Sequence, residues 1–455
     1  MSKFTDLLDR LISPGKSISL PPPGIYHFTR DEQGEKSRIH LRIDADRHAV
    51  LIINASRIVH LNPTAGFMAY LILNQTSQED AKNALVHLYR VSKNQALFDY
   101  TQITQQITEL IRADGACPIH DLDLDILHPF SVRPKVPYRM DLALTYRCNN
   151  NCAHCYNARP RTFPEMETQQ WYEILDATWS LGIPHVVFTG GEPTLRRDLP
   201  ELIAHAEHNG QITGVNSNGR RFADKSYVQE LIDAGLDHVQ ITLESHDPSI
   251  HNQMVGAQQA WEQTTDGLRN VLDSSLYVMT NTTMLRQNSP FLSQTLEFIA
   301  DLGVPTVGLN ALIYAGRGRE VGTEIPEKDL SPMLELARMH TSSHQQRLIW
   351  YTPTQYCHFD PVEFELGVKG CTAALYNMCI EPNGDVIPCQ SYYQPVGNLL
   401  LDPWENIWNH PICYSLRERQ LIPDKCHACA ILSECGGGCP LHNMVDHIPS
   451  GGCNA

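Results

Sequence analysis

Residues 145–156 read TYRCNNNCAHCY and place three cysteines, Cys148, Cys152 and Cys155, in a C-x3-C-x2-C spacing. Cysteine thiolates at such short gaps wrap an iron–sulfur cube or a tetrahedral metal ion. Three thiolates leave the fourth iron of a cube open for chemistry. A zinc site with His154 as its fourth ligand is the alternative, although adjacent residues point apart. We therefore expect a metal centre in this loop.

The composition is that of a globular protein. The 455 residues include 42% hydrophobic and 19% charged residues, which disfavours repeat, collagen-like and disordered classes and predicts two to four domains. The net charge of −16 disfavours nucleic acid as a partner. We find no signal peptide and no apolar run that approaches the roughly 18 residues of a membrane span. We expect a cytoplasmic protein without a membrane partner, in which the thiols stay reduced and bind metal.

Residues 136–320 alternate short apolar strands with amphipathic helices. Six β/α units in a row predict a parallel sheet with right-handed crossovers. Because the pattern does not reach eight units, the predicted α/β fold is an open, partial (β/α)6 barrel of TIM-like type, with functional residues at the C-terminal ends of its strands. The expected strands are 141–146, 185–189, 212–216, 238–243, 277–282 and 306–310, and the expected helices are 168–181, 199–209, 225–234, 260–272 and 291–302.

Polar motifs follow the predicted strands, where a cofactor site is expected. Two consecutive glycines after the second strand let the backbone approach a ligand closely. A simple strand-to-helix turn is the alternative for these glycines, and a solvated surface side chain is the alternative for Arg317. The candidate residues are Gly190, Gly191, Glu192 and Pro193 after the second strand, Asn216, Ser217 and Asn218 after the third, Glu244 and Ser245 after the fourth, Asn281 in the fifth, and Arg317 after the sixth.

A second cysteine pattern fills residues 371–455. Gly384 lies between its first two cysteines, and the segment has few long apolar runs, as in a small domain that needs metal to hold it. A zinc ribbon is the alternative. Cys117 and Cys413 fit no pattern, and we expect both to be ordinary reduced thiols. The seven cysteines of the pattern are Cys371, Cys389, Cys426, Cys429, Cys435, Cys439 and Cys453.

The N-terminal part of the chain predicts a separate unit of mixed type. Strands at 38–44 and 49–61 are followed by helices at 65–73, 81–88 and 100–111, with Asn62 and Pro63 at the start of the first helix. The expected divisions of the chain are a lead-in at 1–20, this unit at 21–117, a linker at 118–135, the barrel at 136–320, a connecting region with a helix at 330–339 over 321–370, and the cysteine-rich domain at 371–455.

The first cysteine loop resembles that of the radical S-adenosylmethionine (radical SAM) enzymes, including the aromatic Tyr156 after the third cysteine. The resemblance implies that the three thiolates hold a [4Fe–4S] cluster whose open iron binds S-adenosylmethionine. Residues 190–193 resemble the GGEP motif, which receives the methionine ammonium. The polar residues after the later strands are then implied contacts of the same cofactor, although the family more often has Asp where Glu244 stands. This chemistry produces a 5′-deoxyadenosyl radical.

The cysteine-rich tail resembles the SPASM domain, the auxiliary-cluster module of many peptide-modifying radical SAM enzymes. The resemblance implies one auxiliary cluster on Cys426, Cys429, Cys435 and Cys453, and a second on Cys371, Cys389 and Cys439. Glu365 and Lys369 stand where related proteins place a further cysteine. The fourth ligand of the second cluster is then Cys357 or Cys379, or an iron stays open for a substrate thiolate.

The N-terminal unit resembles the winged-helix-like PqqD-type domain that recognises peptides, with a dimerisation or capping module as the alternative. Together the resemblances imply an oxidoreductase that modifies a ribosomally synthesised peptide by a thioether, a carbon–carbon or carbon–oxygen cross-link or a related oxidation. Its partners are a precursor peptide and a flavodoxin- or ferredoxin-like electron donor. Maturation of a larger protein, of the sulfatase or quinohemoprotein type, is one alternative. A non-catalytic electron carrier is the other, and the GGEP-like loop counts against it.

Overall fold

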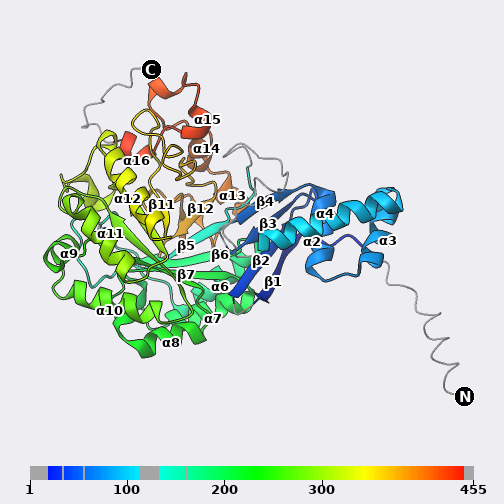
Figure 1. Cartoon of the computed structure of the whole chain (residues 1–455), viewed down its shortest axis with the longest axis horizontal. Coiled ribbons are helices and arrows are strands. Elements are labelled where there is room, and N and C mark those ends of the chain that lie inside the picture. The colour runs from blue at the N-terminus through cyan, green and yellow to red at the C-terminus, as the bar shows by residue number, and fades with distance from the viewer. Residues whose placement is uncertain (1–18, 33–34, 55–56, 112–132, 159–160, 445–455) are drawn as a thin grey trace, which may run out of the picture. The chain divides into compact units, whose positions relative to one another are not determined.

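The chain divides into two compact units, residues 1–126 and 127–455. The computed structural model describes residues 19–32, 35–54, 57–111, 133–158 and 161–444. Figure 1 shows the helices and strands of both units. In the described residues, no helix has the length and apolar character that crossing a membrane requires.

The first unit is a four-stranded antiparallel sheet followed by three helices. The strands β1 (Gly24–Glu32), β2 (Glu35–Ile43), β3 (Ala49–Ile53) and β4 (Arg57–Leu61) pair in chain order. The helices are α2 (Pro63–Leu73), α3 (Gln78–Tyr89) and α4 (Lys93–Ile111). The predicted start of the first helix is confirmed, because the Asn62 side chain accepts a hydrogen bond from the Ala65 N–H and Pro63 takes the first helical position.

The prediction of two strands in this unit was wrong, since the structure has four. The predicted strand at 49–61 is divided after Asn54, which has a φ of 49° and whose side chain accepts a hydrogen bond from the Arg38 N–H at 2.7 Å. Asparagine tolerates this left-handed conformation, so it forms a turn. Strand β1 contributes only partly buried aromatic residues, Tyr26 and Phe28, to the core. Its apolar pattern is therefore weak, and its pairing with β2 defines it.

The second unit contains the predicted partial barrel. Six parallel strands lie in chain order: β5 (Arg139–Thr145), β6 (His185–Gly190), β7 (Ile212–Ser217), β8 (His238–Thr242), β9 (Tyr277–Thr283) and β10 (Thr306–Asn310). The expected open α/β barrel is confirmed. The sheet is longer than predicted, because β11 (Arg347–Trp350) adds in parallel to β10 at one edge.

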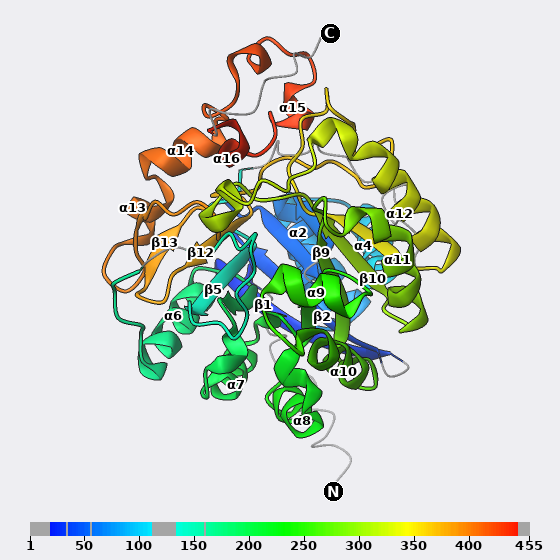
Figure 2. The ribbon, with the colours of Figure 1, turned by 90° about the vertical axis from the view of Figure 1, so that its left-hand side faces the viewer.

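Helices surround the outside of this sheet (Figure 2). Alternate residues of β5, such as Met140, Leu142 and Leu144, are fully buried in the core beneath these helices. The prediction missed α9, which lies between β8 and α10 and is important for the site below. The helices are α6 (Thr168–Ser180), α7 (Leu199–Asn209), α8 (Lys225–Asp233), α9 (Pro248–Val255), α10 (Ala260–Leu272), α11 (Leu292–Asp301) and α12 (Ser331–Ser343), with short 3-10 helices at Pro193–Leu195, Arg220–Ala223, Ser289–Phe291, Gly316–Arg319, Glu327–Asp329 and Asp424–Cys426.

The cysteine-rich tail continues the barrel sheet. Strand β12 (Asn377–Ile380) pairs in parallel with β5, and β13 (Asp385–Ile387) and β14 (Gly397–Asn398) extend the sheet further. Gly384 has a φ of 87° in the turn between β12 and β13, a conformation that favours glycine. The rest of the tail consists of α13 (Trp404–Trp408), α14 (Pro411–Arg417), α15 (Leu432–Cys435), α16 (Pro440–Asn443) and loops.

Candidate cluster and cofactor site

The three-cysteine loop follows β5 at the C-terminal edge of the barrel sheet, as predicted. Burial raises the pKa of the Cys148 thiol to about 11, and it also raises that of Cys152. The charge of Cys155 raises both pKa values further, so the three sulfurs lie close enough to interact. Free thiolates at this spacing repel one another, whereas iron cations stabilise them. The donor set therefore fits an iron–sulfur cluster.

Helix α9 supports the middle of this loop. The N–H groups of Asn151 and Ala153 donate to the carbonyl oxygens of Val255 at 2.8 Å and Met254 at 3.1 Å. Gly256 ends α9 with a φ of 61°, and a Cβ there would lie 2.5 Å from the Asn151 carbonyl oxygen. These contacts fix the backbone that presents Cys152.

The GGEP-like loop packs equally closely against the cysteine loop. A Cβ on Gly190 would lie 2.1 Å from the Thr145 carbonyl oxygen, and one on Gly191 would lie 2.4 Å from that of Arg147. The Gly191 N–H donates to the Thr145 carbonyl oxygen at 2.7 Å. Any side chain at either glycine would push the two loops apart. The glycine pair therefore does more than the simple turn that was the alternative.

Glu192 holds the next two loops together. Its carboxylate is completely buried and accepts hydrogen bonds from the Thr194 hydroxyl at 2.7 Å, the Ser217 hydroxyl at 2.8 Å and the Asn218 N–H at 2.8 Å. Burial raises the pKa of Glu192, and these hydrogen bonds oppose the increase. Pro193, also buried, begins the short helix that follows. In the structure, the side chains of Glu192 and Ser217 are therefore hydrogen-bonded to each other.

Asn218 reaches back to the cysteine loop. Its amide nitrogen donates to Asn149 Oδ1 at 2.6 Å and lies 4.0 Å from Cys148 Sγ. The neighbouring Arg220 donates to the Asn149 carbonyl oxygen at 2.6 Å and to Asn150 Oδ1 at 2.9 Å. Sequence reasoning included Asn218 and missed Arg220, which follows it by two residues in the same loop.

Glu244, another expected cofactor contact, makes its contacts in the structure within the protein. The side chain is fully buried, with Oε1 2.9 Å from His154 Nε2 and Oε2 accepting the Thr283 N–H at 2.8 Å. Both oxygens are thus used within the protein, and Glu244 orients the cysteine loop through His154. The other ring nitrogen of His154, Nδ1, is buried without a hydrogen-bond partner.

The remaining predicted contacts divide between buried and partly accessible positions. Ser245 is fully buried, and its hydroxyl accepts the Asp247 N–H at 3.1 Å just before α9. Asn216 and Asn281 are partly accessible on β7 and β9, and Oδ1 of Asn281 is buried without a hydrogen-bond partner. An amide oxygen without a partner is the kind of group that a bound ligand satisfies. The contact of Asn281 with the cofactor stays a prediction.

Arg317 and Tyr156 connect the end of the cysteine loop to other segments. The Arg317 N–H donates to the Cys155 carbonyl oxygen at 3.1 Å, and its guanidinium donates to Asn151 Oδ1. Arg317 is partly buried, and its Nε is buried without a hydrogen-bond partner. The Tyr156 hydroxyl donates to Gln390 Oε1 at 2.6 Å, which joins the loop to the residue after Cys389.

Electrostatic interactions link the described tail cysteines in two sets. The first tail set is Cys426, Cys429 and Cys435, and the second tail set is Cys371, Cys389 and Cys439. Burial raises the pKa of Cys389 to about 12 and that of Cys371 further, and the thiol of Cys439 adds to both increases. In the first tail set, burial followed by the charges of Cys435 and Cys429 raises the pKa of Cys426. Cys453 and Cys117 lie outside the described residues.

Cys357 and Cys379, the two candidates for the fourth ligand of the second auxiliary cluster, lie at different places. Cys357 follows Tyr356, whose N–H donates to Cys435 Sγ at 3.3 Å, so it lies beside the first tail set. Eleven of the described cysteines are free thiols, and Cys379 is one of them. Cys379 is buried on β12, in the hairpin that leads to Cys389. Glu365 is exposed and pairs with Arg338 at 3.5 Å.

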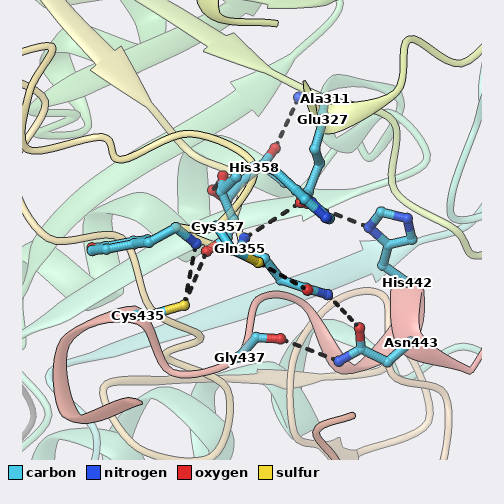
Figure 3. Close-up of polar contacts among 12 residues, drawn as sticks. Ala311, Glu327, Gln355, Cys357, His358, Cys435, Gly437, His442 and Asn443 are labelled. Carbon is cyan, nitrogen blue, oxygen red and sulfur yellow. Dashed lines mark hydrogen bonds and ion pairs between the residues drawn. The ribbon is translucent and has the colours of Figure 1, made fainter. Parts of the chain in front are cut away.

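A polar network that sequence reasoning missed supports the tail (Figure 3). The buried Glu327 carboxylate lies 2.7 Å from His358 Nδ1 and 3.3 Å from His442 Nδ1. The Gln355 amide nitrogen donates to Asn443 Oδ1 at 3.1 Å. The network joins residues more than 80 positions apart, so no local pattern could predict it. It ties the connecting region to the segment that follows Cys439.

Two family models match this chain. The radical SAM superfamily matches residues 142–310, and the iron–sulfur cluster-binding SPASM domain matches residues 371–430. The chain therefore belongs to the radical SAM superfamily and carries a SPASM domain. Its cofactors are S-adenosylmethionine and [4Fe–4S] clusters, and it is an enzyme.

Solved structures share this fold at low identity. The structure of SuiB from Streptococcus suis bound to its precursor peptide SuiA has a TM-score of 0.67 and 15% identity, covering 92% of this chain and 96% of that one. SuiB bound to S-adenosylmethionine has a TM-score of 0.65 and 17% identity, covering 89% and 95%. Native anSMEcpe with bound AdoMet has a TM-score of 0.54 and 14% identity, covering 67% and 89%.

Proposed function

We propose that this enzyme generates a 5′-deoxyadenosyl radical to modify a ribosomally synthesised peptide through a thioether, a cross-link or a related oxidation. The observation that carries the proposal is that the three-cysteine loop packs between the GGEP-like loop and α9. The strand before this loop, β5, belongs to the same sheet as the strands of the cysteine-rich tail. The fold shared with SuiB, one structure of which holds a precursor peptide, supports a peptide substrate. The N-terminal unit is then the peptide-recognition domain.

We propose a role for each group of residues. Cys148, Cys152 and Cys155 hold the cluster that, when loaded, supplies the radical chemistry. The backbone at Gly190 and Gly191 receives the methionine part of S-adenosylmethionine, while Asn216 and Asn281 offer amide groups to it. Glu192 and Glu244 keep the surrounding loops in place without touching the cofactor. Each tail set holds an auxiliary cluster, so we infer two such clusters.

The test is the yield of 5′-deoxyadenosine from anaerobically reconstituted protein with S-adenosylmethionine and a strong reductant. We expect the Cys148→Ala variant to give no product above background. The matched control is Cys413→Ala, which removes a buried free thiol in α14 that belongs to neither tail set. This variant should keep the wild-type yield. Equal yields from wild type and Cys148→Ala would refute the proposed function.

The substrate class has its own test. Co-expression with short reading frames encoded next to this gene, followed by mass spectrometry, should show a peptide that changes only with the intact enzyme. A loss of two hydrogens indicates a cross-link. A folded protein that is modified in place of every short peptide would favour the alternative, maturation of a larger protein.

A further inference from the structure

The two tail sets are separated by one short turn. Cys435 of the first tail set and Cys439 of the second are joined by Gly436, Gly437 and Gly438, with φ angles of 70°, 76° and 78°. These left-handed conformations require glycine and leave the surface of the turn open to other side chains. A Cβ on Gly437 would lie 2.6 Å from Ile422, and one on Gly438 would lie 2.9 Å from Gln355.

The side chain that lies against Gly436 is a cation. Nη1 of Arg419 is 2.3 Å from the position that a Cβ of Gly436 would occupy. The guanidinium is held there by hydrogen bonds to the carbonyl oxygens of Leu432 at 2.8 Å and Ser433 at 3.4 Å. A small cavity beside it is lined by Cys371 as well as by Arg419 and Gly436. The guanidinium therefore lies against the residue that follows Cys435, and it shares the lining of this cavity with Cys371.

The electrostatic environment agrees with this position. Burial lowers the pKa of Arg419, and the charges of Cys371 and Cys435, followed by those of Tyr376 and Tyr356, raise it. One thiol from each tail set thus interacts with the same cation. The charged neighbours of Arg419 in the chain face elsewhere, since Glu418 pairs with Arg133 and Arg417 lies over the Trp408 ring.

We propose that Arg419 sets the reduction potentials of both auxiliary clusters. A cluster gains one negative charge when it accepts an electron, and a nearby guanidinium stabilises that reduced form. Arg419 then raises both potentials together and favours the auxiliary clusters as electron acceptors. The inference rests on the proposed function, because it requires clusters on the two tail sets.

The experiment is an anaerobic redox titration of the reconstituted protein followed by electron paramagnetic resonance. A Cys148→Ala background removes the signal of the radical SAM cluster and leaves the auxiliary signals. We expect Arg419→Gln to lower the reduced-to-oxidised ratio about tenfold at the wild-type midpoint, which is a shift of about 59 mV for a one-electron couple. Arg419→Lys keeps the charge, so both midpoints should stay close to their wild-type values.

A matched control separates charge at this place from charge in general. Arg417 is two residues away, partly buried, and donates to the carbonyl oxygens of Ala374 and Trp408, but the cysteine it interacts with is Cys413. Arg417→Gln should leave both midpoints unchanged. Unchanged midpoints in Arg419→Gln with a full iron content would overturn the inference.

A second variant covers the case in which Arg419→Gln loses its clusters. Arg419→His carries a cation at about pH 6 and a neutral ring at about pH 8. Its auxiliary midpoints should fall between these two pH values more steeply than those of the wild type. Equal pH dependence in both proteins would refute the role of Arg419. Absence of auxiliary iron in the wild type would instead refute the cluster assignment.

Discussion

Glu192 shows how one buried side chain can hold several loops of a site together. Its carboxylate accepts hydrogen bonds from Thr194, from the Ser217 hydroxyl and from the Asn218 N–H, and Asn218 in turn contacts the cysteine loop. A carboxylate can accept from all these donors because it has two oxygens and no hydrogen. An amide of the same shape cannot, since one of its ends is itself a donor.

We therefore predict that Glu192→Gln impairs the enzyme while preserving its iron. Leaving a buried donor without an acceptor costs about 1–3 kcal/mol, so the yield of 5′-deoxyadenosine should fall about ten- to hundredfold. Product and iron content are measured on the same reconstituted sample. The control is Glu201→Gln on α7, where an exposed carboxylate accepts one long hydrogen bond of 3.4 Å from Tyr172. A wild-type yield from Glu192→Gln would contradict this role.

Helix α9 acts as an element that shapes the cysteine loop. Asp247 caps its first turn, Pro248 takes its first position and Gly256 ends it. These are ordinary start and stop signals, and they could have predicted the helix. What they could not predict is that its last carbonyl groups bind Asn151 and Ala153, about 100 residues earlier.

At the scale of this element, we predict that Gly256→Ala weakens cluster binding. The new Cβ would lie 2.5 Å from the Asn151 carbonyl oxygen and force the loop to move. Gly303→Ala is a matched control, because Gly303 also has a positive φ, 82°, but has no atom within 4 Å of an added Cβ. Both variants should lose about 1 kcal/mol of stability from backbone strain. The signal of the radical SAM cluster should fall in Gly256→Ala alone, and equal signals would show that the contact is unimportant.

For the whole molecule, the core of the barrel unit, as far as the structure describes it, begins at Val136 and consists of residues of the second unit. A chain that starts at residue 127 should therefore fold. We predict that it cleaves S-adenosylmethionine without peptide within about threefold of the full-length rate, since the first unit has a core of its own. Circular dichroism and 5′-deoxyadenosine yield provide the measurement. An insoluble or inactive truncated protein would show that the first unit is required for folding.

The sequence predicted most of the second unit because its evidence is local. Apolar strands, amphipathic helices and the glycine pair all follow short patterns, and the six strands lie within one or two residues of their predicted bounds. The functions of single polar residues were harder to predict. Glu244 meets His154 across 90 positions and Arg317 meets Asn151 across 166, so their partners are set by the folded sheet alone.

The pairing of β12 with β5 has a consequence for how this enzyme can be engineered. A strand from the tail is hydrogen-bonded to the first strand of the barrel, with Cys379 opposite Asp141. Removing the tail would expose the backbone of β5 as an open sheet edge, which invites association with other chains. A swap of tails between related enzymes therefore exchanges part of the barrel sheet as well. The barrel and the tail should therefore be exchanged together as a single module, with the junction placed before β5.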